Sequence, residues 1–235
     1  MTDDLSLEEG FKAGALYLVF SDGKRIEFSF ENVRTFAGQY LDSPKHIPDH
    51  VRHAVDFQRC CVCPEAGEAG YCHALAPYLT IFDKVDKYPS YEQVQAFYLD
   101  PATNNLSFKK TSLQNALQYV SMLSVIDYCE FGRQYRDYFF MVTPLMKMAD
   151  IAMRIYLNAF WLCGGDKEQT ALRLRKFSGV LAITIDCQVK RLRLISRSDS
   201  VLNAFVLTHV LTGMLKEDMD KTLKEGFEQH KRQMM

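Results

Sequence analysis

The chain has 235 residues, of which 48% are hydrophobic and 24% charged, and its formal net charge at pH 7 is −1. This length and composition suit one large or two small globular domains that bury a sizeable core without covalent staples. The near-zero net charge excludes a protein whose whole surface attracts nucleic acid or acidic membranes, so any basic patch must be local.

In the N-terminal part, an apolar run over 15–20 and a segment over 25–30 in which apolar and polar residues alternate lie on either side of Asp22-Gly23. This pattern predicts a β-hairpin closed by a tight turn with positive φ at both central residues. Further expected elements are a short helix over 32–40, a helix over 73–85, and strands over 94–99 and 106–109. Residues 1–110 are therefore expected to form a mixed α/β region with about four strands.

The remainder, residues 111–235, is expected to be helical. Thr111-Ser112-Leu113-Gln114 matches a capping box, which predicts a helix that begins there and runs to about residue 128. Three further helices are expected, one between Pro144 and Gly164-Gly165, one over about 167–194, and one from Ser198 or Asp199 to near Gly213. A last helix would place apolar residues on one face, namely Leu215, Met219, Leu223 and Phe227.

These elements predict an α+β fold, in which a small antiparallel sheet with a Cys-rich metal loop packs on a C-terminal helical bundle. We expect regions 1–110 and 111–235 to form one integrated domain. The acidic N-terminus is unlike a secretory signal. The most apolar stretch, residues 138–163, is interrupted by charged residues and does not fit a membrane span. We therefore expect a cytoplasmic protein with no membrane partner.

Seven cysteines in a cytoplasmic chain are expected to be thiols or metal ligands rather than disulfides. Cys60 and Cys63 form a C-x-x-C pair followed by proline, a loop in which two thiolates can face one ion. Eight residues separate Cys63 from Cys72. The pattern indicates a structural zinc site. Two alternatives remain open: a redox thiol pair, and cysteines that simply pack as small buried apolar side chains.

A tetrahedral zinc site needs a fourth ligand. The candidates are Cys129, which would join the helical region to the mixed region, and three nearer residues, Cys61, His73 and His53. His53 belongs to a cluster with His46 and His50, whose side chains could supply a ligand or a base but are more often ordinary loop residues.

A second feature is a run of basic residues over 173–197, with Asp186 as its single acidic residue. Such a run could bind phosphate groups of a nucleic acid. It has no interleaved aromatic residues, however, and acidic residues at 217–220 could pair with it, so a solvated or internally paired face is favoured. The chain also has no glycine-rich phosphate loop, no G-x-S-x-G and no H-E-x-x-H.

Several of these features occur in the same order in a known family. The features are the hairpin, C-x-x-C-P, the cysteine that opens a helix, Ser90-Tyr91-Glu92, the helix start at 110–114, Cys129, Tyr135-Arg136 and Pro144. Together they resemble an uncharacterised bacterial family, a domain of unknown function from proteobacteria. The resemblance covers residues 14–228. It implies Cys60, Cys63, Cys72 and Cys129 as the metal-ligating set, and it implies no activity.

The chain departs from that family at several positions. The family's third and fourth cysteines are followed by proline, whereas here His73 and Glu130 follow them, and the family's extra arginine and histidine correspond to Phe140 and Val142. These departures remove the polar groups of that segment and leave the cysteines in place.

From the sequence we therefore expect a non-enzymatic, zinc-stabilised interaction or regulatory protein that binds a protein partner. One alternative is a metal- or thiol-dependent enzyme that uses the Cys60, Cys63 and Cys72 region. The other is a nucleic-acid binder that acts through the basic helix over 173–197.

Overall fold

The computed structural model of the chain describes residues 11–36, 38–39, 60–61, 63, 72–196, 199–216 and 231. Its strands are β1 (Ala15–Phe20), β2 (Arg25–Ser29), β3 (Gln93–Leu99) and β4 (Leu106–Ser112). Its helices are α1 (Phe30–Phe36), the 3-10 helix η3 (His73–Leu75), α3 (Ala76–Leu79), α4 (Phe82–Val85), α5 (Leu113–Ile126), the 3-10 helix η4 (Gly132–Phe139), α6 (Met148–Leu162), α7 (Lys167–Leu192) and α8 (Ser200–Lys216). This is the α+β fold that the sequence predicts.

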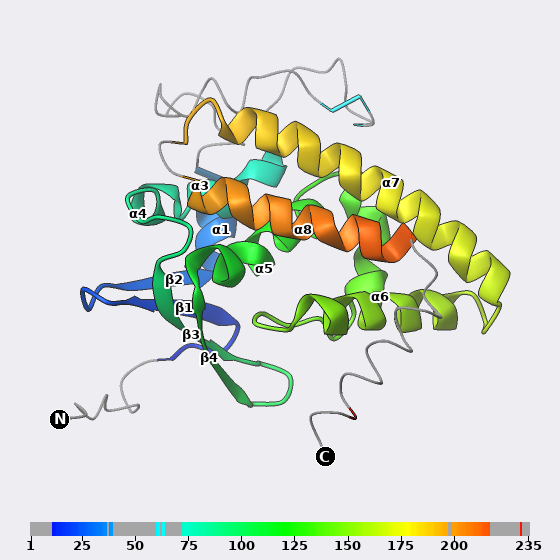
Figure 1. Cartoon of the computed structure of the whole chain (residues 1–235), viewed down its shortest axis with the longest axis horizontal. Coiled ribbons are helices and arrows are strands. Elements are labelled where there is room, and N and C mark those ends of the chain that lie inside the picture. Colours follow the sequence, from blue (N-terminus) through cyan, green and yellow to red (C-terminus); the bar gives the residue numbers. More distant parts are fainter. Residues whose placement is uncertain are drawn as a thin grey trace.

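The four strands form one antiparallel sheet in the order β2-β1-β3-β4, at one end of the molecule (Figure 1). Alternation along the strands gives the sheet two different faces. One face, which includes Leu18, its β2 partner Ile26 and its β3 partner Ala96, lies in the main hydrophobic core. The other face holds a small separate cluster around Tyr17 and Phe97, against which Phe11 packs.

The hairpin has the predicted strands but a different turn. Gly23 has φ +80°, whereas Asp22 does not have a positive φ. The Gly23 N–H donates to the carbonyl of Phe20 at 3.0 Å, and the Phe20 N–H donates to the carbonyl of Lys24 at 2.9 Å. These bonds define a three-residue loop in which glycine takes the left-handed position, so the prediction of two positive φ angles was wrong.

The helices form a layer beside the sheet, in which α8 packs against both α5 and α7, and α6 packs against η4 (Figure 1). A single cluster of buried apolar side chains joins the sheet to this layer, from Leu16 and Phe28 through Leu117 to Phe177 and Phe205. In the described part of the chain, no helix is both long enough and apolar enough to cross a membrane.

The helix α5 begins without the predicted capping box. Thr111 is a buried residue of β4 that pairs with Val94, and Ser112 is the N-cap but its side chain makes no capping hydrogen bond. The exposed N–H groups of the first turn are satisfied by backbone instead: Leu113 donates to the carbonyl of Glu92 at 2.8 Å, and Gln114 donates to that of Ser90 at 3.0 Å. The carbonyl groups of Ser90 and Glu92 thus accept hydrogen bonds from the start of α5 in place of the Thr111 and Gln114 side chains.

Other helix boundaries also differ from the predictions. The expected helix over 73–85 is broken into η3, α3 and α4, with Pro77 near the start of α3, where its missing N–H costs nothing. The helix η4 was not predicted, and α6 begins at Met148 rather than at Pro144. The helix α8 continues past Gly213 to Lys216, and Leu215 remains buried beyond Gly213. The predicted last helix lies outside the described residues except for Leu215.

Candidate functional site

The four cysteines that the sequence singled out line one cavity of about 120 Å³. The cavity, called here the cysteine cavity, lies between η3, the link from α5 to η4, and the second half of α7. Its lining residues are Cys60, Cys63, Cys72, His73, Ala74, Tyr128, Cys129, Glu130, Phe131, Arg133, Thr184, Gln188 and Arg191.

The cysteines reach this cavity from three separate parts of the chain. Cys60 and Cys63 form the C-x-x-C pair, here called the cysteine segment. Cys72 immediately precedes η3, and Cys129 lies in the link between α5 and η4. Cys60 is buried and the other three are partly buried. The tertiary structure therefore brings together the set that the family resemblance implies, although those residues are up to about seventy positions apart in the sequence.

The other residues proposed as fourth ligand lie in different places. His73 lines the cysteine cavity, whereas Cys61 is exposed and is not among the residues that line it. His46, His50 and His53 lie outside the described residues.

The backbone around Cys72 and Cys129 directs N–H groups toward the two sulfur atoms. The Ala74 N–H donates to the Cys72 thiol, and the N–H groups of Phe131 and Gly132 donate to the Cys129 thiol. Each of these turns is closed by a bond to the cysteine carbonyl: Leu75 N–H donates to Cys72 at 3.2 Å, and Arg133 N–H donates to Cys129 at 2.9 Å. Donors placed in this way stabilise a thiolate over a thiol, which is the form that binds metal.

A comparable turn holds the C-x-x-C pair together. The Cys63 N–H donates to the carbonyl of Cys60 at 2.9 Å, so the chain reverses between the two thiols. This reversal lets both side chains face the same cavity, as the C-x-x-C spacing predicts.

Gly132 is required where the link enters η4. A Cβ atom built on Gly132 would overlap the carbonyl oxygen of Val125 and would lie 2.7 Å from its carbonyl carbon. Only glycine lets the link run this close to the end of α5. The close approach fixes the position of Cys129, whose sulfur accepts the Gly132 N–H.

The sequence analysis missed the contribution of α7 to this site. Thr184, Gln188 and Arg191 are each at most 1% exposed, and they lie at helical spacing on the face of α7 that lines the cavity. The signal that could have found them is this stripe of polar residues spaced four and three apart on an otherwise apolar face. The sequence pattern instead predicts that Arg191 belongs to a basic surface.

Arg191 places a permanent positive charge beside the thiols. Its guanidinium donates a hydrogen bond to the Cys72 thiol and acts electrostatically on Cys60 as well. A fifth cysteine, Cys187, lies one residue before Gln188 on α7 and makes a hydrogen bond with Cys60.

Ser124 ties three of the elements around the cavity together. Its hydroxyl contacts the carbonyl of Ala74 in η3 and lies 2.7 Å from Oε1 of Gln188 in α7. Ser124 itself is fully buried in α5. The floor of the cavity is thus held by polar contacts among η3, α5 and α7.

Burial raises the pKa of the Cys60, Cys72 and Cys129 thiols. For Cys60, the hydrogen bond with Cys187 raises the pKa further; for Cys72, the charge of Arg191 opposes the effect of burial. The pKa of Cys129 rises to about 11 in spite of the N–H donors from Gly132 and Phe131. Without a metal ion these three groups are therefore neutral at pH 7, and a metal would have to displace their protons.

In the described part of the chain, no three His, Cys, Asp or Glu side chains are already arranged at the spacing of a bound metal ion. The chemistry of the donors nevertheless fits zinc, because four cysteine thiols face one enclosed space and tetrahedral zinc accepts four thiolates. Closing on an ion would require movement of side chains already gathered around the cavity.

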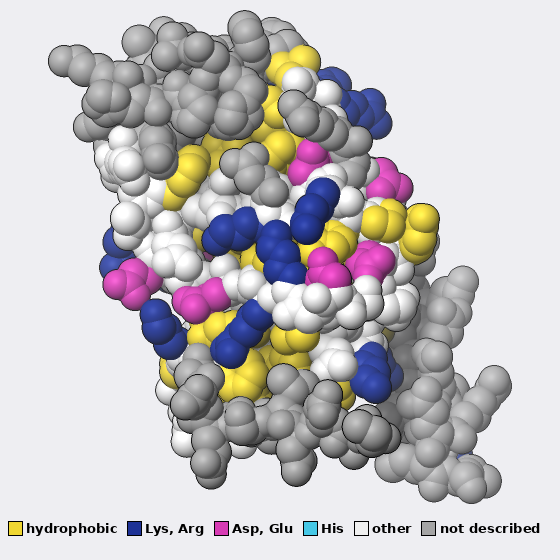
Figure 2. Space-filling model, turned by 90° about the vertical axis from the view of Figure 1, so that its left-hand side faces the viewer, with side chains coloured by type: hydrophobic (Ala, Val, Ile, Leu, Met, Phe, Trp, Pro, Cys, Tyr) yellow, Lys and Arg dark blue, Asp and Glu magenta, His cyan; other side chains and the backbone are white. Residues whose placement is uncertain are grey.

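The basic run of α7 does not form one continuous surface. Arg191 is fully buried, and Lys190 forms an ion pair with Asp186 at 2.7 Å, whereas Arg173, Arg175 and Lys176 are exposed near the other end of the helix. The acidic residues at 217–220 and Arg197 lie outside the described residues. On the face seen in Figure 2, Lys and Arg side chains have Asp and Glu side chains beside them.

Comparison with protein-family models, with curated proteins and with solved structures found no match for this chain.

Proposed function

We propose that the chain is a non-enzymatic, zinc-stabilised interaction or regulatory protein, in which Cys60, Cys63, Cys72 and Cys129 bind one structural zinc ion. The observation that carries this proposal is that these four residues, from three separate segments, line one cavity. The ion would clamp the cysteine segment and η3 to the link between α5 and η4.

The four-cysteine set supports a structural rather than a catalytic ion. Catalytic zinc keeps an open position for water or substrate, whereas four protein ligands leave none. Arg191 supports the same role, because its buried positive charge would offset the net negative charge of zinc bound by four thiolates. The N–H groups that point at Cys72 and Cys129 would be retained as donors to the bound thiolates.

The interaction role is supported by large apolar side chains near the turn between α6 and α7. Trp161 and Leu172 are 65% and 69% exposed, and Leu162 is also exposed. Apolar side chains of this size on a surface are typical of contacts with another protein.

The first experiment measures metal content and stability in matched cysteine variants. Full-length protein purified without chelator is expected to contain about one equivalent of zinc, and Cys129→Ser to lose most of it. Cys61→Ser is the control, since Cys61 is exposed and outside the cavity lining. A zinc content below about a tenth of an equivalent in the unmodified protein, or equal loss in the Cys61→Ser control, would refute the site.

The second experiment separates a structural ion from a catalytic one. Cobalt substituted for zinc reports its coordination through visible absorption. We expect a tetrahedral four-thiolate spectrum that does not change when azide or cyanide is added, because no position is open. A spectrum that shifts with either anion would favour the metal-dependent enzyme instead.

A further inference from the structure

A second cavity, of about 380 Å³, shares no lining residue with the cysteine cavity. Its volume falls within the range of small-molecule sites. The residues that line this α5–η4 cavity are Tyr119, Met122, Leu123, Ile126, Asp127, Arg136, Asp137, Phe139, Phe140 and Val142.

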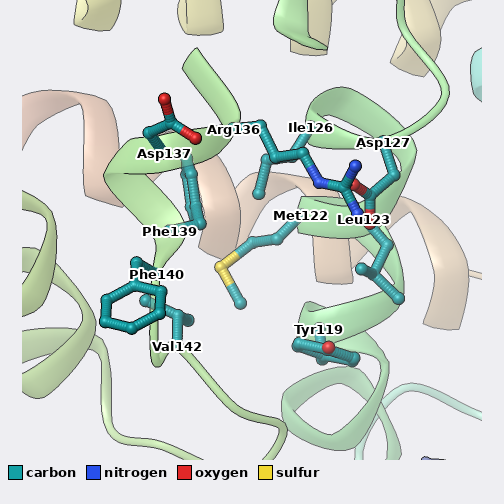
Figure 3. Close-up of a pocket in the computed structure, with 10 residues that line it drawn as sticks. All are labelled: Tyr119, Met122, Leu123, Ile126, Asp127, Arg136, Asp137, Phe139, Phe140 and Val142. Atoms are coloured by element: carbon teal, nitrogen blue, oxygen red, sulfur yellow. The ribbon is translucent and has the colours of Figure 1, made fainter.

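The body of the α5–η4 cavity is apolar. Figure 3 shows Met122, Leu123 and Ile126 from α5 facing Phe139, Phe140 and Val142, with Met122 in the space between the two walls. Met122, Leu123 and Ile126 are at most 5% exposed, so their packing in the core fixes this wall. An apolar substituent of a ligand would be buried between these walls.

Charged groups meet at one end of the cavity. Nε of Arg136 lies 3.1 Å from Oδ1 of Asp127, and Figure 3 shows the guanidinium against this carboxylate, with Asp137 pointing away from the pair. Asp127 is 18% exposed, whereas Arg136 is 73% exposed. The lining therefore holds one more carboxylate than guanidinium groups, and its most enclosed charge is negative.

Arg136 is largely exposed to water, whereas Asp127 is largely enclosed, so solvent screens the positive charge of this pair more than the negative one. A cationic ligand would be attracted to the enclosed carboxylate of Asp127, whereas an anionic ligand would compete with Asp127 for Arg136.

Three aromatic rings also line the cavity, from Tyr119, Phe139 and Phe140. Faces of aromatic rings attract cations, and rings combined with a carboxylate are the usual surroundings of bound organic ammonium groups. Tyr119 adds a hydroxyl for which the described residues provide no hydrogen-bond partner. Burial raises the pKa of this phenol, so it stays protonated and neutral.

The exposed ring of Phe140 is held at the cavity by a specific backbone arrangement. Phe140 is 64% exposed, and Nδ2 of the buried Asn158 donates to the carbonyls of Tyr138 and Phe140, each at 2.8 Å. The next residue, Met141, has φ +59°, which is strained for a residue with a side chain. An exposed aromatic residue fixed by a buried anchor and a strained neighbour is typical of a binding site.

We propose that the α5–η4 cavity binds a small organic ammonium ion, with its charge at Asp127 and its apolar substituent between α5 and Phe139, Phe140 and Val142. This site is separate from the cysteine cavity, and its ligand does not have to contact zinc. A ligand here would make the chain a small-molecule receptor as well as an interaction protein.

The test compares three probes of nearly equal size by calorimetric titration of the full chain: 2-phenylethylammonium, 2-phenylethanol and phenylacetate. The cation is expected to bind at least about tenfold more tightly than the neutral alcohol, the ratio that one charge-assisted hydrogen bond provides. Phenylacetate is expected to bind most weakly of the three.

Two variants locate the site. Asp127→Asn is expected to reduce the preference for the cation over the alcohol to less than about threefold, while Asp150→Asn, which changes an exposed carboxylate on α6 in the same way, keeps it. Phe140→Ala is expected to weaken cation binding about threefold or more through the loss of one ring.

Equal binding of cation and alcohol, tightest binding of phenylacetate, or no binding of any probe would each overturn the proposal, as would an unchanged preference in Asp127→Asn. Zinc content, measured on the same samples, distinguishes this outcome from failure of the metal site. A chain without zinc that prefers the cation would contradict only the proposed function.

Discussion

Replacing Gly132 with alanine tests whether the α5–η4 link is held by its close approach to α5. The added Cβ would overlap the carbonyl oxygen of Val125 and lie 2.7 Å from its carbonyl carbon and 3.1 Å from its Cγ1. Carbon atoms in favourable contact are about 3.5–4.0 Å apart. The two nearest obstructing atoms belong to the backbone, so no side-chain rotation can relieve the overlap.

The link would have to move away from α5 by about 1 Å or more to restore that separation. Overpacking a core costs about 1–3 kcal/mol and more where the surroundings are rigid. Because the obstructing atoms are backbone, we take the cost at the upper end of this range. Alanine also reduces the conformational entropy of the unfolded chain, which raises the free energy of unfolding by about 0.4–1 kcal/mol. We therefore expect the free energy of unfolding to fall by about 2–3 kcal/mol, which lowers Tm by about 4–12 °C in a chain of this size.

The same movement should also weaken zinc binding in the cysteine cavity, because the Gly132 N–H donates to the Cys129 thiol and would shift with the link. The assay is urea denaturation followed by circular dichroism, with zinc content measured on the same samples. Gly179→Ala in α7 is the matched control: nothing lies within 4 Å of a Cβ built there, so alanine should stabilise the helix by about 1 kcal/mol. If Gly132→Ala is as stable as the unmodified chain, the close approach does not hold the link, and our reasoning about Cys129 is wrong.

Two further predictions concern the core and the α5–η4 cavity. Phe177 is 1% exposed and contacts the rings of Tyr135 and Tyr138, so Phe177→Ala should lower the free energy of unfolding by about 3–5 kcal/mol. The control is Leu172→Ala, which removes an exposed side chain and should change this free energy by about 0.5 kcal/mol at most. A small effect of Phe177→Ala in urea denaturation would contradict the packing described. Burial raises the pKa of the Asp127 carboxyl, so the folded chain binds the carboxyl proton more tightly than the unfolded chain does. The protonated carboxyl therefore adds to the free energy of unfolding below the pKa of the unfolded chain, and this contribution is lost as pH rises through the pKa of the folded chain. The stability of the unmodified chain relative to Asp127→Asn should therefore fall as pH rises above about 4, and a rise over that range in paired thermal melts would show that Arg136 dominates instead.

Local sequence signals predicted the elements that depend on neighbouring residues. The apolar run and the alternating segment on either side of Asp22-Gly23 predicted β1 and β2, and the glycine pair at 164–165 marked the end of α6, where both residues have positive φ. The cysteine spacing singled out Cys60, Cys63 and Cys72, which line one cavity. Each of these features is set by residues that lie near one another in the sequence, where periodicity and turn chemistry act.

Long-range partners decided what the local signals left open or misplaced. The first turn of α5 takes its hydrogen bonds from the carbonyls of Ser90 and Glu92, so the capping-box side chains are not used. Arg191 belongs to a basic run in the sequence, yet the packing of α7 places it in a buried cavity with the cysteines. Its surroundings come from residues more than fifty positions away, and no local pattern encodes them.

The cavities show the same division. The sequence by itself determined the four thiols and the apolar faces of α5, because residue type and helical spacing are properties of the chain. Only the tertiary structure placed Asp127 and Arg136 together at the end of an apolar cavity, and Cys129 in one cavity with Cys60 and Cys72. These arrangements depend on how closely the link approaches α5, and that distance is fixed by packing at Gly132 rather than by any periodic signal.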